Sequence, residues 1–315
     1  MLYERRRPTK RVRADEIYSA DFIRAFKAEF GMNPDEAMEG FGELMDLAIE
    51  CDSVVVETTL GKLRKRLISE RGLAPDICNA FFKTFGLFHR LEWDQPPAGF
   101  IKKDLSPWRF NRRLSLTVRP LLIFGGRDED KVIYGVGSFF QGVGHLIQRT
   151  ENGQLPPEFF TTGRMKEYVG SVNDERGHAF AKSVAGKFAK DGWNVRYEVE
   201  MTELGASSEL GDIDVLAWKP DAKVLLIECK RLRLARTVAE IAEICRRFCG
   251  EAKDELVRHV KRVGWVMKHL SSLEPIIGFT PEMTQIDARL VTNTHVPMTY
   301  LTSLPIPARK IGPLK

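Results

Sequence analysis

The sequence predicts an α/β protein with a mainly helical N-terminal domain and a C-terminal domain built on a mixed sheet. Its 315 residues, of which 43% are hydrophobic and 29% charged, suit two soluble domains of roughly 100 to 200 residues each. Residues 16–90 carry apolar side chains at helical spacing, whereas residues 170–305 follow the order α, β, β, β, α, β. We expect a cytoplasmic protein without a membrane contact, because no apolar run reaches the roughly 20 residues that span a bilayer.

The first fifteen residues are expected to form a basic arm. Within residues 1–13, the only acid, Glu4, is outnumbered by six cations: Arg5, Arg6, Arg7, Lys10, Arg11 and Arg13. The net charge of the whole chain is +5. Clustered cations of this kind contact phosphate backbones, which favours a nucleic acid as the partner, although a solvated basic arm gives the same pattern. The five scattered cysteines indicate a reducing compartment rather than a disulfide framework.

The N-terminal domain is expected over residues 16–160. Its helical segments form a small bundle and cover residues 18–30, 34–50, 59–72 and 74–91. The last two segments, with a basic group on the first of them, also fit a helix-turn-helix, although any packed helical pair gives this pattern. Residues 91–112 are rich in proline and aromatic side chains and predict an irregular connection. A β-hairpin with a Gly-Gly turn at Gly125 and Gly126 follows.

The proline- and glycine-rich residues 151–164 predict the domain boundary, so the C-terminal domain is expected over residues 165–315. Its first helix should begin at Ser171, which has Asp174 three residues later as in a capping box, and end at Gly192. Strands are expected at residues 193–201, 213–218 and 223–230. One long helix from Thr237 to about Leu270 and a last strand at residues 286–296 complete the domain.

Two of these strands carry charged residues in otherwise buried runs: Asp214 on one, and Glu228 and Lys230 on the next. Glu228 and Lys230 face the same side of the sheet, because side chains alternate along a strand. Asp214 joins them only if the hairpin loop has three residues, 220–222. Two carboxylates in a core suit Mg²⁺ or Mn²⁺, and an adjacent lysine can hold or deprotonate a water molecule. The residues therefore predict metal-assisted hydrolysis of phosphodiester bonds.

These residues and the element order resemble the PD-(D/E)xK, or restriction-endonuclease-like, nuclease superfamily. The resemblance rests on Asp214 in GDIDVLA and on Glu228, Cys229 and Lys230 as the E-x-K, and it covers residues 170–305. It implies an endonuclease in which Asp214, Glu228 and the Cys229 carbonyl bind the divalent ion while Lys230 serves the water. It also favours DNA over RNA as the substrate, because the superfamily acts mostly on DNA.

One position departs from the superfamily pattern. Relatives of the Mrr type carry a glutamate where GHAFA places Ala181, and Glu175 is the candidate to replace it as a catalytic residue. Three cations after the last motif residue are expected to bind phosphates: Arg231, Arg233 and Arg236. The alternative is a catalytically inactive nuclease-fold subunit that binds nucleic acid or acts as a scaffold. A homodimer through the long helix, or a larger defence-type complex, is the expected assembly.

Overall fold

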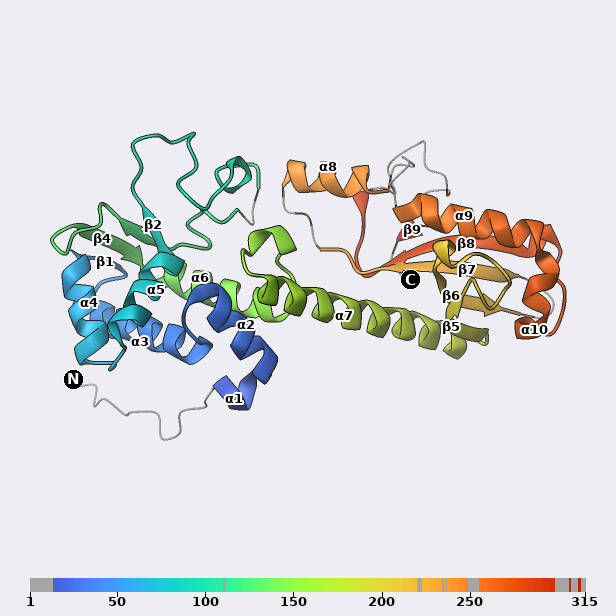
Figure 1. Cartoon of the computed structure of the whole chain (residues 1–315), viewed down its shortest axis with the longest axis horizontal. Coiled ribbons are helices and arrows are strands. Elements are labelled where there is room, and N and C mark those ends of the chain that lie inside the picture. The colour runs from blue at the N-terminus through green and yellow to red at the C-terminus, as the bar shows by residue number, and fades with distance from the viewer. Residues whose placement is uncertain are drawn as a thin grey trace. The chain divides into compact units, whose positions relative to one another are not determined.

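The computed structural model describes residues 14–109, 112–219, 223–233, 235, 237–248, 255–297, 306 and 311–312. The chain forms two compact units, residues 1–173 and 174–315. Each unit has a sheet of its own (Figure 1). The protein is therefore mixed α/β, as the sequence predicts. No helix in the described part of the chain is long and apolar enough to cross a membrane.

The predicted helical bundle of the N-terminal unit is confirmed. Its helices are α1 (Ala14–Ile17), α2 (Ala20–Phe30), α3 (Pro34–Glu50), α4 (Leu60–Ser69), α5 (Pro75–Phe85) and α6 (Val136–Glu151), with short 3₁₀ turns at η1 (Lys102–Asp104) and η2 (Pro157–Phe159). Asn33 and Glu36 form a capping box that starts α3. The core that these helices share is rich in aromatic rings, and Phe81 and Phe139 are buried at its centre.

The N-terminal sheet has the strand order β1–β4–β3–β2. Its strands are β1 (Val55–Thr59), β2 (Gly86–Phe88), β3 (Leu121–Ile123) and β4 (Lys131–Gly135). Strands β3 and β4 are antiparallel and form the predicted hairpin. Strand β2 was predicted as part of a helix, but α5 ends at Phe85 and residues 86–88 pair in parallel with β3. The apolar run at 81–88 is compatible with either state, so tertiary pairing decides it.

Helix α7 (Gly163–Lys190) contributes to the cores of both units. Met165 and Val169 are buried in the N-terminal core, whereas Ala181 and Phe188 are buried in the C-terminal unit. The predicted helix start at Ser171 is wrong, because the Ser171 hydroxyl donates to the Tyr168 carbonyl inside the helix. The division between the units accordingly falls after Asn173, within α7, rather than in residues 151–164.

The C-terminal sheet is mixed and has the strand order β5–β6–β7–β8–β9. Its strands are β5 (Asn194–Glu200), β6 (Asp212–Trp218), β7 (Val224–Lys230), β8 (Ile286–Thr292) and β9 (Ile311–Gly312), and 3₁₀ turns lie at η3 (Ser208–Leu210), η4 (Leu270–Leu273) and η5 (Met283–Gln285). Strands β5, β6 and β7 are antiparallel neighbours, while β8 runs parallel to β7 and to β9. The four strands predicted from the sequence are all present as β5 to β8.

The register of β6 and β7 is the one that brings the motif residues together. Val215 pairs with Ile227 and Trp218 with Val224. The Lys219 amide donates to the Lys223 carbonyl, so the connection spans the three residues 220–222, which is the condition under which Asp214 joins the other motif residues. Continued by one position, this register places Asp214 beside Glu228.

Helices cover both faces of this sheet (Figure 1). Ala181 and Phe188 of α7 pack with Val215 and Ile227 on one face. On the other face, Val263 of α9 packs with the alternate residues of β6 and β7. The predicted single long helix is observed as α8 (Val238–Arg246) and α9 (Glu255–Lys268), and α10 (Glu274–Ile277) precedes β8. Apolar residues of the segment predicted as the long helix pack inside the unit at Phe248, Leu256 and Val263.

Candidate active site

The candidate site lies where β6 and β7 carry Asp214, Glu228 and Lys230. Glu228 is buried, with 3% of its surface exposed, while Asp214 and Lys230 are half-buried. The Cys229 amide donates a 2.5 Å hydrogen bond to Asp214 Oδ2, which ties the carboxylate of one strand to the backbone of the next. Lys230 Nζ lies 3.0 Å from Glu228 Oε1. The structure thus brings the three residues together: Lys230 contacts Glu228 directly, and Asp214 is bonded to the amide of Cys229, which lies between them in the chain.

Glu228 has a second cationic partner, Arg262 of α9, which the sequence reasoning missed. Arg262 Nη1 donates to Glu228 Oε2 at 2.5 Å, and its Nε donates to the Leu210 carbonyl at 2.6 Å. Both carboxylate oxygens of Glu228 therefore face positive charge. An arginine that occupies an inward position on an amphipathic helix is the sequence signal that could have pointed to this pair.

His259 is the other residue of α9 at this site that the sequence reasoning missed. Its side chain is fully buried, and Nδ1 lies 3.7 Å from Glu228 Oε2. Neither ring nitrogen has a hydrogen-bond partner among the described residues. Burial lowers the pKa of His259 to about 4, although the charge of Glu228 acts in the opposite direction. His259 is therefore a neutral imidazole at neutral pH.

The two carboxylates repel each other in a poorly solvated place. Burial, followed by the charge of Glu228, raises the pKa of Asp214 to about 7, while the Cys229 amide and Lys230 oppose the rise. Burial also raises the pKa of the Cys229 thiol, with the charge of Asp214 as the second cause. The Cys229 side chain belongs to the α7 face of the sheet. Its carbonyl, rather than its thiol, is thus the group suited to a hard cation.

The backbone of β5 is distorted beside Asp214. Tyr197 pairs with Val215 and Val199 with Ile213, which leaves Glu198 opposite Asp214. Glu198 has φ 54°, a left-handed conformation that a glutamate rarely adopts. Its carboxylate contacts the His178 ring of α7 and raises the pKa of that imidazole. Strained residues of this kind cluster at functional sites, and here the strain lies one strand away from a motif carboxylate.

The structure does not link the remaining acid candidate to the site. Glu175 is exposed on α7, and within the described residues it makes no hydrogen bond or ion pair. Ala181, which stands where some relatives have a glutamate, is only 5% exposed and packs with apolar residues of the sheet.

The predicted phosphate-binding arginines follow β7. Burial and the nearby charge of Arg176 lower the pKa of Arg231. Arg231 and Arg233 are exposed just beyond β7, while Arg236 lies outside the described residues.

The donor set suits a cation that keeps most of its water. Across the described ranges, no three His, Cys, Asp or Glu side chains gather closely enough to hold a metal ion by themselves. Mg²⁺ in phosphate-processing sites usually takes one or two protein carboxylates and completes its shell with water and substrate oxygens. Asp214 and Glu228 meet this requirement, and the pKa of Asp214, which burial and the charge of Glu228 raise, would fall beside a bound cation. These residues fit Mg²⁺ or Mn²⁺, and they do not form a dedicated protein cage.

The basic face of α4 is the second surface that the sequence offers for contact with DNA. Arg66 of this helix donates to Glu43 at 2.5 Å and to Glu50 at 2.7 Å. Arg64 is paired with Asp128 at 2.5 Å. These cations hold the N-terminal unit together, which weakens the interpretation of α4 and α5 as a helix-turn-helix that contacts DNA.

Comparison with known proteins places nearly the whole chain in one family. The family model described as "anti-phage protein Upx-like" matches residues 4–311. The chain belongs to the Upx-like family. No curated protein and no solved structure matches it. The match spans both units, so the Upx-like description refers to the helical N-terminal unit as well as to the sheet that carries Asp214 and Glu228.

Proposed function

We propose that this Upx-like protein is a metal-dependent endonuclease of the PD-(D/E)xK type that acts in phage defence by cutting nucleic acid in the cytoplasm. Its proposed substrate is DNA rather than RNA. The observation that carries the proposal is the convergence of Asp214, Glu228 and Lys230 on adjacent strands. The family match supports a role in defence against phages. The element order α7, β5, β6, β7, α9, β8 supports the nuclease-like fold.

Asp214, Glu228 and the Cys229 carbonyl are the groups that would hold Mg²⁺ or Mn²⁺. When bound, the ion would stabilise charge on the scissile phosphate and lower the pKa of a bound water. The Lys230 side chain, which lies 3.0 Å from Glu228, would orient the attacking water as an ammonium group, and as a neutral amine it would accept the proton of that water and later return it. Arg262 fixes the orientation of the Glu228 carboxylate. Arg231 and Arg233, together with Arg236 outside the described residues, would bind neighbouring phosphates.

Cleavage assays with purified protein test this proposal. Plasmid DNA, single-stranded DNA and RNA are each incubated with Mg²⁺, Mn²⁺ or EDTA. Metal-dependent cleavage by the wild type should be lost in Asp214→Asn and in Lys230→Ala. The matched control is Lys223→Ala, since Lys223 is an exposed lysine that precedes the other end of β7. Cleavage that persists in Lys230→Ala, or that is lost equally in Lys223→Ala, would contradict the assignment.

The second candidate function is a nuclease-fold subunit without catalysis. It is favoured by the two cations on Glu228, Lys230 and Arg262, which can neutralise the carboxylate without a metal ion. Calorimetric titration with Mn²⁺ separates the two functions. A nuclease should bind the ion and lose this binding in Asp214→Asn. An inactive subunit should bind DNA with an affinity that does not change when the ion is added. Light scattering would show whether such a subunit acts alone, as a homodimer or within a larger defence complex.

A further inference from the structure

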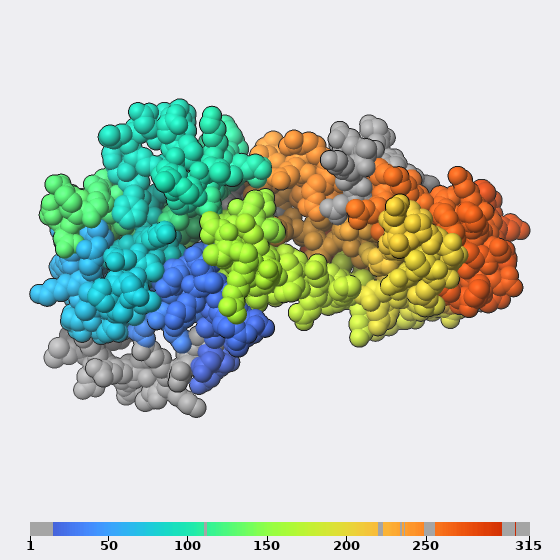
Figure 2. All heavy atoms as spheres, in the orientation of Figure 1, coloured from blue at the N-terminus to red at the C-terminus, as the bar shows by residue number. Residues whose placement is uncertain are grey.

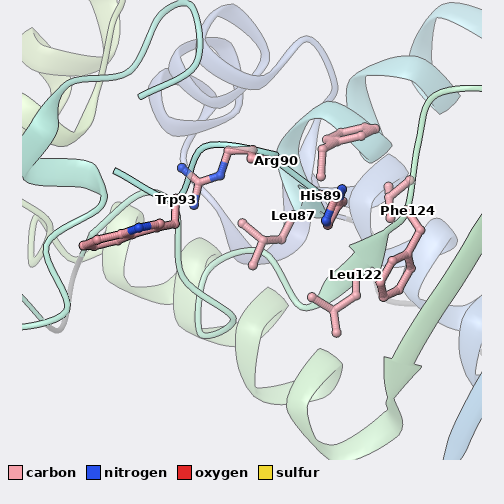
Figure 3. A pocket seen from close by; sticks show the side chains of 8 residues that line it. Leu87, His89, Arg90, Trp93, Leu122 and Phe124 are labelled. Carbon is pink, nitrogen blue, oxygen red and sulfur yellow. The ribbon is translucent and has the colours of Figure 1, made fainter. Parts of the chain in front are cut away.

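The outer face of the N-terminal sheet has a pocket of about 220 Å³ beside the edge strand β2. Leu121 and Ile123 are buried in the core, so the alternate residue Leu122 faces the other way. Leu122 is the register partner of Leu87, and the two leucines lie in the middle of the pocket. Figure 3 shows Arg90 and Trp93 at one end of the pocket and His89 and Phe124 at the other.

The walls of this pocket are aromatic and solvent-exposed. Trp93 is 81% exposed and Phe124 is 48% exposed. The His89 ring stacks on Phe124, with 6.3 Å between the ring centroids and 20° between the planes. Exposed apolar side chains gathered around one pocket mark binding sites. Rings that present their faces to solvent are the platforms on which proteins stack unpaired bases.

Arg90 gives the pocket a polar requirement. Its Nη1 atom is buried and has no hydrogen-bond partner in the described part of the chain. A donor left without an acceptor is unfavourable, so a ligand that offers an acceptor to the Arg90 guanidinium would be favoured in the pocket that Arg90 lines. The edges of nucleobases carry ring nitrogens and carbonyl oxygens that accept such bonds. An apolar peptide side chain offers no such acceptor.

The segment around the pocket is positively charged. Residues 89–120, which connect β2 to β3, contain seven Arg or Lys residues and three Asp or Glu residues. Asp104 is already engaged by Arg113, whereas Lys102 and Lys103 are exposed and have no ion pair in the described ranges. Figure 2 shows this segment in turquoise on the surface of the N-terminal unit. A phosphate backbone complements this charge.

We infer that this pocket binds an unpaired base of single-stranded nucleic acid. The base stacks against the aromatic walls formed by Trp93, His89 and Phe124, and Arg90 donates to its edge. At about 220 Å³ the pocket is smaller than the roughly 300–1,000 Å³ of sites that enclose whole drug-sized ligands, which suits one ring system. The inference goes beyond the proposed nuclease, because the pocket lies within the N-terminal unit and needs no metal ion.

Fluorescence anisotropy with the full chain in EDTA tests this inference independently of cleavage. A labelled single strand, as DNA and as RNA, is compared with its fully paired duplex at one salt concentration. Trp93→Ala and Phe124→Ala should each weaken single-strand binding about fivefold or more, the loss expected for one stacked base. Duplex affinity should stay within about twofold, since it depends on phosphate contacts. Trp93→Phe, which keeps a ring, should restore most of the affinity.

The matched control is Phe140→Ala, because Phe140 is 58% exposed on α6 and does not line the pocket. Circular dichroism checks that each variant folds. If Phe124→Ala does not fold, Trp93→Ala still tests the inference, because Trp93 is highly exposed and its removal leaves the core intact. Wild-type affinity in Trp93→Ala, or an equal loss in Phe140→Ala, would overturn the inference. The inference would also be overturned if a free nucleoside monophosphate, at the same concentration as the labelled strand, displaced that strand from the protein. That result would assign the pocket to a small nucleotide. Absence of single-strand binding by the wild type would also overturn it and would favour a protein partner.

Discussion

Arg262 on α9 donates a 2.5 Å hydrogen bond to Glu228 on β7, and both side chains are more than nine-tenths buried. Lys230 approaches the other oxygen of the same carboxylate at 3.0 Å. The helix and the strand are therefore joined by a buried ion pair at the edge of the candidate site. Arg262 therefore fixes the position of the Glu228 carboxylate, with or without a bound metal ion.

Replacing Arg262 by methionine should strongly destabilise the C-terminal unit. Removal of Arg262 leaves the buried Glu228 carboxylate with Lys230 as its remaining cationic contact, and breaking a buried pair in this way costs up to about 3–5 kcal/mol of unfolding free energy. Glu228→Gln in the same chain should recover part of this loss, because no buried charge then remains beside position 262. Urea denaturation followed by circular dichroism measures both values.

The exposed pair Arg196–Glu203 in the same unit is the control for this prediction. Its side chains are 43% and 40% exposed, and surface pairs contribute about 0–1 kcal/mol. Arg196→Met should therefore change stability little. An Arg262→Met variant as stable as Arg196→Met would show that the buried pair does not hold α9 on the sheet.

Replacing Asp214 by asparagine should raise stability at pH 8 in the absence of metal, while it abolishes metal binding. At that pH, above the folded pKa of about 7, the Asp214 carboxylate is ionised beside Glu228 and destabilises the folded state. Asparagine removes this charge and still offers an oxygen to the Cys229 amide. Thermal unfolding in EDTA should give a higher Tm for Asp214→Asn, a pattern typical of functional residues. A lower Tm would indicate that Asp214 serves the fold rather than a ligand.

The pH dependence of stability should reveal His259 and Asp214 as opposing groups. The folded pKa of His259, about 4, lies below the value near 6.5 of an unfolded histidine, so the unfolded chain binds more protons in this window. His259 therefore makes stability fall as the pH is lowered from about 7 to 4. Asp214 has a folded pKa of about 7, above the unfolded value near 3.9, and makes stability rise over the same interval.

Single variants separate these two contributions. Relative to wild type, His259→Leu should retain more stability as the pH falls, and Asp214→Asn should retain less. Each difference has a limiting slope of about 1.4 kcal/mol per pH unit, the value for one proton. Urea denaturation at several pH values measures both differences, and groups elsewhere in the chain cancel in the comparison. Parallel profiles for the two variants would contradict the assigned pKa directions.

Local patterns in the sequence were sufficient to predict the strands of the site, whereas their register depended on a hairpin loop of three residues, a condition that the structure meets. Alternation along β7 puts Glu228 and Lys230 on one face, and the short connection 220–222 brings Asp214 opposite Glu228. Both properties depend on residues close together in the chain. The predicted start of α7 at Ser171 failed, because the burial of Met165 and Val169 in the other unit extends the helix beyond its local capping signal.

The long-range partners of the site could not be predicted. Helical periodicity indicates that His259 and Arg262 of α9 can face the sheet, but it does not say which strand residue each one meets. Their contacts with Glu228 depend on how α9 crosses β7. The left-handed backbone of Glu198 is likewise imposed by tertiary packing, since glutamate has no preference for that conformation. The base-stacking pocket combines β2, which the sequence reasoning assigned to a helix, with the irregular segment that follows it.

The N-terminal unit has its own buried carboxylate, which predicts a second strongly destabilising variant. The Glu43 side chain is 1% exposed and accepts hydrogen bonds from Arg66 at 2.5 Å and from Arg71 at 2.9 Å. This carboxylate joins α3 to α4 and to the turn after α4. Glu43→Ala should lower the unfolding free energy by about 1.5–3 kcal/mol, because Arg66 and Arg71 lose the acceptor that they share but keep Glu50 and Asp46 as partners.

The control for Glu43 is Glu57→Ala, which removes the exposed pair with Lys131 on the same unit's sheet. Its side chains are 58% and 52% exposed, so a change of about 0–1 kcal/mol is expected.

A Glu43 variant also tests whether α4 contacts DNA. If Arg66 serves only the fold, Glu43→Gln should weaken the unit without raising DNA affinity at any salt concentration. A rise in affinity with a steeper salt dependence would show that the released arginines reach phosphates, and would restore α4 as a nucleic-acid surface.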